Sequence, residues 1–143
     1  MPYEFVDDVA TADIAFRAWG ATLEETFVAA ATAVMQVMVE NLEAIRPCQE
    51  RRITVEHEAL DLLLFNFLQE PVYYKDAEQL LLVVAQVEIA RHAGGYRLTA
   101  TARGEHLDST RHDLRVDVKA VTLHRFRLQQ RAHGWEALVI LDI

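Results

Sequence analysis

Carboxylates near the two ends of the sequence are the residues whose type and spacing best suit a functional site. Asp13 lies on the polar side of an alternating segment, and Asp142 stands next to the terminal carboxylate of Ile143. If the first and last strands pair, three oxygen donors come together, which is the ligand set that Ca²⁺ or Mg²⁺ prefers. Any acidic domain also carries carboxylates that only face solvent, so the spacing alone leaves both interpretations open.

The residue types and their spacing give little support for catalysis. Ser109 is the only serine and Cys48 the only cysteine, and the charged neighbours of Ser109 lie in one short loop. A catalytic triad is normally assembled from distant segments. The sequence has no phosphate-binding loop, and its six histidines lack the spacing of zinc ligands. We therefore expect the protein to have no catalytic activity of its own.

His124 differs from the other histidines in its expected position. A strand predicted over 116–131 puts His124 in register with the apolar side chains of that strand. A histidine there is either a hydrogen-bonded core residue or part of a site. In the second case it would be the general base of a metal-dependent hydrolase acting on a phosphate-containing small molecule, with Asp13 and Asp142 holding the metal.

Hydrophobic periodicity predicts the elements that position these residues. Thr22 and Glu25 form a capping box, which indicates the start of a helix. Pro71 is expected to end a second helix, because proline has no backbone N–H to donate. The predicted elements are strands over 11–19 and 51–56, helices over 22–39 and from 60 until Pro71, and strands over 80–91, 96–103, 116–131 and 136–143.

With one further strand before residue 11, the element order is β-β-α-β-α-β-β-β-β, which predicts one α+β domain over residues 1–143. We expect two layers, in which two helices cover one face of a mostly antiparallel sheet. No linker or repeat divides the 143 residues, of which 52% are hydrophobic. A chain of this size buries enough surface to fold without disulfides or metals, so a bound ion would serve function.

The charge of the chain limits its partners. With 14 Lys and Arg against 22 Asp and Glu, the net charge is −8, which repels nucleic acid and suits cations or a basic protein. The single cysteine and the lack of a signal or membrane-spanning segment predict a cytoplasmic location without membrane contact. Exposed edge strands would permit a homo-oligomer.

Short motifs spread along the chain form a pattern more specific than any one of them. They are Tyr3-Glu4-Phe5, Thr11-Ala12-Asp13, Gly20 to Glu25, Asp61 to Leu68, Lys75 to Glu78, Ala102 to Glu105, Arg111-His112, Val118 to His124 and Leu141-Asp142-Ile143. In their order and spacing the sequence resembles the archease family over essentially its whole length.

The resemblance implies an accessory protein of the GTP-dependent RNA ligase of tRNA splicing and RNA repair. Such a protein promotes guanylylation and multiple turnover of the ligase without doing that chemistry itself. The resemblance also puts the divalent-ion ligands of the family on Asp13, Asp142 and Ile143. The sequence departs from the family motif at Ala10, where the family has His, and at Ala15, where it has Gly. A chaperone-like module is a third interpretation, although the sequence lacks a Met-rich surface for clients.

Three further residues are candidates for partner contact. Lys119 and His124 lie in the family-like segment, and His112 lies in the preceding loop. By strand alternation Lys119 shares a face with Asp117, opposite His124, so the three cannot enter one pocket unless the strand is bulged. Lys119 either pairs with a neighbour across the sheet or contacts the partner.

Overall fold

The computed structural model describes residues 2–6 and 13–143. The start of the strand predicted over 11–19 and the motif departure at Ala10 lie outside these residues. The elements are β1 (Tyr3–Val6), β2 (Asp13–Gly20), α1 (Leu23–Met38), η1 (Leu42–Ala44), β3 (Gln49–His57), α2 (Leu60–Glu78), β4 (Leu80–His92), β5 (Gly95–His106), β6 (Ala120–Arg131) and β7 (Gly134–Asp142). The predicted order of strands and helices is confirmed, with the short 3₁₀ helix η1 added.

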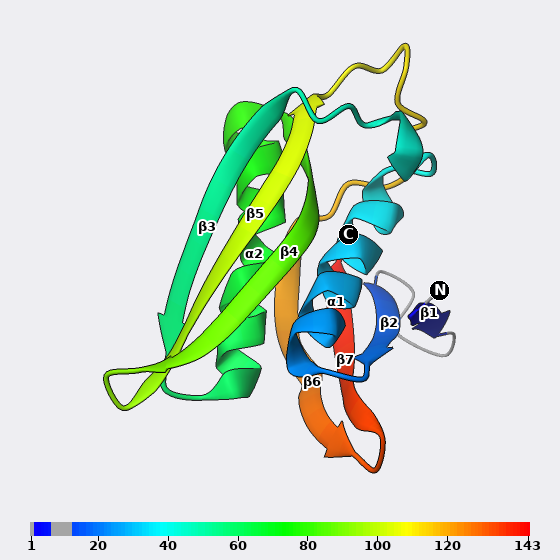
Figure 1. Ribbon diagram of the computed structural model, residues 1–143. Helices are drawn as coiled ribbons and strands as arrows, with labels where there is room; N and C mark the ends of the chain where they lie inside the picture. Colours follow the sequence, from blue (N-terminus) through cyan, green and yellow to red (C-terminus); the bar gives the residue numbers. More distant parts are fainter. Residues whose placement is uncertain (1, 7–12) are drawn as a thin grey trace.

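The strands form two antiparallel sheets, in the orders β1-β2-β7-β6 and β3-β5-β4. The α+β class and the antiparallel pairing are confirmed, but the strands do not form the single sheet that we expected. Alternation along a strand shows which face is buried and does not show which strand lies beside it. Both helices contact strands of both sheets, and Figure 1 shows the two sheets on either side of the molecule.

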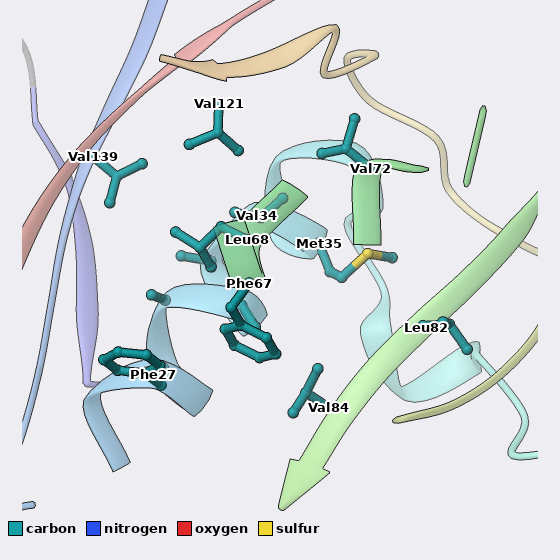
Figure 2. Close-up of a cluster of buried hydrophobic side chains, with 14 of the residues drawn as sticks. Phe27, Val34, Met35, Phe67, Leu68, Val72, Leu82, Val84, Val121 and Val139 are labelled. Carbon is teal, nitrogen blue, oxygen red and sulfur yellow. The ribbon is translucent and has the colours of Figure 1, made fainter. Parts of the chain in front are cut away.

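The core fills the space where the helices meet the two sheets. The rings of Phe27 from α1 and Phe67 from α2 stack with centroids 6.0 Å apart. Figure 2 shows side chains of both sheets around them, with Leu82 and Val84 from β4 and Val121 and Val139 from β6 and β7. Within the described residues, no helix has the length and apolar character needed to cross a membrane.

Helix α1 begins as the sequence predicts. The Glu25 N–H donates to the Thr22 hydroxyl at 3.1 Å, and the Glu25 carboxylate accepts from the Ala21 N–H at 3.0 Å. The first bond satisfies a backbone donor that the first turn of a helix leaves unpaired, and the second fixes the residue just before the N-cap. The helix start predicted at Thr22 is therefore confirmed, although Glu25 reaches the N–H of Ala21 and not that of Thr22.

Helix α2 continues through Pro71, where we expected it to end, and reaches Glu78. Pro71 lacks the N–H that would bond to the carbonyl of Phe67, which normally weakens a helix. Phe67, Pro71 and Lys75 nevertheless follow one another at helical spacing and are all buried. Packing of this continuous face outweighs the lost hydrogen bond, and the helix ends at Gln79 in the left-handed conformation (φ 52°).

Candidate metal centre

The pairing of β2 with β7 brings Asp13 directly opposite Asp142. Residues directly opposite in an antiparallel pair point to the same face, with Cβ atoms about 4.5 to 5.5 Å apart. Both residues are half-buried. Like charges in this arrangement repel each other, so the pair is unfavourable unless a positive charge lies between them.

The donor set at this strand pair fits a hard cation. Asp13 and Asp142 offer carboxylate oxygens, and Ile143 follows directly with its main-chain oxygens. Oxygen ligands of this kind suit Ca²⁺ or Mg²⁺ better than softer metals. Within the described residues, no three His, Cys, Asp or Glu side chains gather in a metal-binding arrangement. The set therefore has two side-chain ligands and depends on Ile143 for the third.

Lys119 lies beside the same carboxylate pair. Its backbone N–H donates to the carbonyl oxygen of Asp142 at 2.8 Å, and the next residue, Ala120, pairs with Asp142 in the sheet. The Lys119 side chain is exposed. The backbone of Lys119 is thus fixed beside the strand end that carries Asp142, and its exposed side chain is accessible to a partner.

Lys75 holds the segment that carries Lys119. The buried ammonium group of Lys75 donates to Asp117 at 2.6 Å, to the Val118 carbonyl at 2.9 Å and to Asp76. Burial alone lowers the pKa of Lys75, but the hydrogen bonds to Asp117 and Asp76 outweigh that effect, and the pKa is raised. Lys75 is therefore charged and ties residues 117–118 to α2. It is Lys75, rather than Lys119, that pairs with Asp117.

Sequence reasoning gave Lys75 no role because the second helix was expected to end before it. The signal was nevertheless present, since Lys75 continues the spacing of Phe67 and Pro71 on the buried face of α2. A lysine at a core position of a helix needs partners for its charge. Two aspartates and one carbonyl oxygen supply them here.

The predicted position of His124 on an apolar face is wrong. Strand β6 begins at Ala120 instead of residue 116, and its pairing with β7 shifts register between Thr122 and Arg127. This irregularity, with Arg125 at φ 54°, breaks the alternation and leaves His124 exposed. His124 also lies four residues along β6 from Ala120, the partner of Asp142. The hydrolase alternative needs His124 beside the carboxylates and draws no support from this arrangement.

His112 is buried, so its side chain offers a partner no surface. Its Nδ1 accepts from the Asp108 N–H at 2.9 Å, which leaves Nε2 to donate to Glu105 at 2.9 Å. Glu105 also accepts from the Arg46 N–H at 2.8 Å and from the Arg111 guanidinium. His112 therefore fixes the loop after β5 in place, and its expected role in partner contact does not fit this structure.

Acidification should destabilise the protein through Glu105. The Arg46 N–H, together with His112 and Arg111, lowers the pKa of Glu105 from 4.5 to about 2. A carboxylate with a lowered folded-state pKa contributes stability above its ordinary pKa, and this stability is lost as the pH falls toward the folded-state value. Melting temperatures of the wild type should thus fall between pH 4.5 and 2. Glu105→Gln should melt lower at neutral pH and lose less on acidification, whereas parallel curves would contradict the assignment.

The chain is similar to proteins of one known family. The model of the Archease protein family matches residues 3–143. The protein archease of Thermococcus gammatolerans is 40% identical over 134 residues, covering 93% of this chain and 94% of that protein. The protein archease of Methanopyrus kandleri is 32% identical over 143 residues and covers both chains completely (100%).

Two solved structures share the fold. The solution structure of Methanobacterium thermoautotrophicum protein 1598 superposes with a TM-score of 0.86 at 35% identity and covers 99% of both chains. The crystal structure of an archease from Thermotoga maritima, described as a possible chaperone, gives a TM-score of 0.65 at 17% identity over 98% of both chains. The second likeness concerns the fold alone.

Proposed function

Because the chain belongs to the archease family, we propose that it activates a GTP-dependent RNA ligase of tRNA splicing or RNA repair. In this role it promotes guanylylation and multiple turnover of the ligase, using a divalent cation held by Asp13, Asp142 and Ile143. Family membership makes the chain an archease-type accessory protein. We propose in addition that its partner is an RNA ligase and that it binds a divalent cation.

The observation that carries the proposal is the pairing of Asp13 with Asp142. Two carboxylates face each other at half-buried positions, and the repulsion between them is relieved when a cation is shared. A bound cation supplies positive charge that attracts phosphate or carboxylate oxygens. The chain's own residues orient it, since β2 and β7 fix the two carboxylates and the Lys75 cluster fixes the neighbouring Lys119.

The charge of the chain supports a protein partner over RNA. A net charge of −8 disfavours contact with a phosphate backbone and favours a basic protein surface. Lys119 and His124 are both exposed and are the candidates for direct contact, whereas His112 is buried. The proposal includes a cytoplasmic location.

Calorimetric titration with Ca²⁺ and Mg²⁺ tests the cation site directly. We expect the wild type to bind one of these cations, and Asp13→Ala or Asp142→Asn to weaken binding by at least about tenfold, because each removes one of two side-chain ligands. Glu58→Gln is the matched control, since Glu58 is exposed and lies in the turn before α2. Equal cation affinity in the wild type and in Asp13→Ala would remove the site from the proposal.

A further inference from the structure

A groove of about 830 Å³ opens along α1, away from the candidate metal centre. Its walls include Pro2 and Tyr3 at one side and residues 85–87 of β4 at the other. Both β1 and β4 are edge strands of their sheets. Trp19 at the far end of β2 also lines it, so the groove lies six residues from Asp13 along one strand, or roughly 20 Å at about 3.3 Å per residue.

The floor of the groove has the length of a short extended peptide. Glu24, Val28, Thr32 and Gln36 line it and recur at every fourth position on one face of α1. At about 1.5 Å per residue, this stripe runs for roughly 18 Å. An extended segment of about five or six residues has the same length, at about 3.3 Å each.

The described lining of the groove combines apolar side chains with acidic ones. Tyr3, Trp19, Val28, Leu42 and Val87 contribute apolar surface. Among the described residues, the charged side chains that line the groove are those of glutamates, and none is Lys or Arg. Carboxylates beside apolar surface attract Lys and Arg side chains and repel phosphates. The charge therefore disfavours RNA and anionic lipid headgroups as occupants.

We infer that this groove binds an extended segment of a partner protein in which apolar side chains alternate with Lys or Arg. The apolar side chains fill the space between the two sheet edges, and the basic side chains pair with Glu24 and Glu43. Neither the cation nor an RNA ligase is needed for this binding. Anchoring of a partner and action at the cation site are then separate functions at opposite ends of β2.

Fluorescence titration with synthetic peptides tests the groove. Trp19 lines the groove, so a Trp135→Phe background leaves Trp19 as the sole tryptophan and as the reporter. The probe is a peptide of alternating Lys and Leu, compared with peptides in which Glu or Gln replaces Lys. We expect the Lys-Leu peptide to bind at least about tenfold more tightly than either of the others, because only it combines apolar side chains with positive charge.

Matched variants separate the groove from the overall charge. Thr32 is half-buried in the groove, and its hydroxyl bonds only within α1, to the Val28 carbonyl. Thr32→Lys should weaken binding by at least about tenfold by adding bulk and positive charge, while Thr32→Val should not. Glu24→Gln with Glu43→Gln should abolish the preference for Lys-Leu, while the exposed pair Glu58→Gln with Asp61→Asn should preserve it.

Several results would overturn the inference. They are equal binding of the three peptides, unchanged binding in Thr32→Lys, and an equal loss of preference in the two charge-neutralised pairs. The glutamate variants keep the test valid if Thr32→Lys fails to fold, as monitored by circular dichroism. Cation affinity, measured in the same variants, should stay at the wild-type value, so failure of the groove is distinct from failure of the proposed function.

Discussion

In multiple-turnover RNA ligation by the cognate GTP-dependent ligase, Asp13→Ala and Asp142→Ala are expected to lose the stimulation that the wild-type protein gives. Each substitution removes one of the two facing carboxylates while leaving the core unchanged, because both residues lie at the end of a strand pair and are only half-buried. The number of product molecules formed per ligase is the measurement. The protein without ligase should show no ligase, nuclease or phosphatase activity.

Stability measurements serve as the control for this experiment. Asp142→Asn should melt at or slightly above the wild-type temperature in metal-free buffer, because it removes a like-charge contact with Asp13. A large fall in melting temperature would make the carboxylate structural. If the double variant of Asp13 and Asp142 still stimulates the ligase at the wild-type level, the carboxylate pair is not the working surface, and Lys119 becomes the first residue to test.

Phe67→Ala is expected to lower the free energy of unfolding by about 3 to 5 kcal/mol, the range for removing a large aromatic side chain from a core. Phe67 is fully buried and stacks on Phe27 at an interplanar angle of 20°. The substitution therefore removes contacts with both α1 and the sheets, and the well-packed surroundings leave a cavity. Urea unfolding followed by circular dichroism measures the change.

Tyr73→Ala is the matched control on the same helix. Tyr73 is also aromatic but is 57% exposed. Its truncation should change the free energy of unfolding by no more than about 0.5 kcal/mol, as is usual for surface positions. Equal losses in the two variants would mean that α2 is stabilised by its own helix formation and not by the core.

The sequence predicts elements well where the signal is local. The helix start at Thr22 is confirmed, and the strands predicted over 80–91 and 96–103 are present as β4 and β5. They are joined by a tight turn with positive φ at Ala93 (49°) and Gly94 (82°). Prediction from the sequence fails where contacts between residues far apart in the chain determine the structure. Pro71 is tolerated inside α2 because the helix face around it is buried, and the pairing of β6 with β7 shifts register between Thr122 and Arg127. Neither effect is visible in a window of neighbouring residues.

The candidate site divides in the same way. The pairing of the Asp13 strand with the strand of Asp142, on which the predicted cation site depended, is present in the structure. The polar positions of the two residues did not determine it, because alternation along a strand does not show which strands pair. Cation binding there stays a prediction. The Lys75 cluster and the α1 groove depend on which segments meet in space, namely α2 with residues 117–118, and α1 with both β1 and β4. The spacing of residues within one segment does not show which distant segments come into contact.

The order of the strands also determines when each part of the protein can form during synthesis. Strand β7, which carries Asp142, is the last element made, and it lies between β2 and β6 in its sheet. Strand β2 therefore has no β7 to pair with while more than half of the chain is translated. Each described residue that lines the groove precedes Glu88 in the sequence, so all of them emerge before β6. A chain translated only through β5 thus contains these groove residues and still lacks the carboxylate pair, which can form only after β7 has been made.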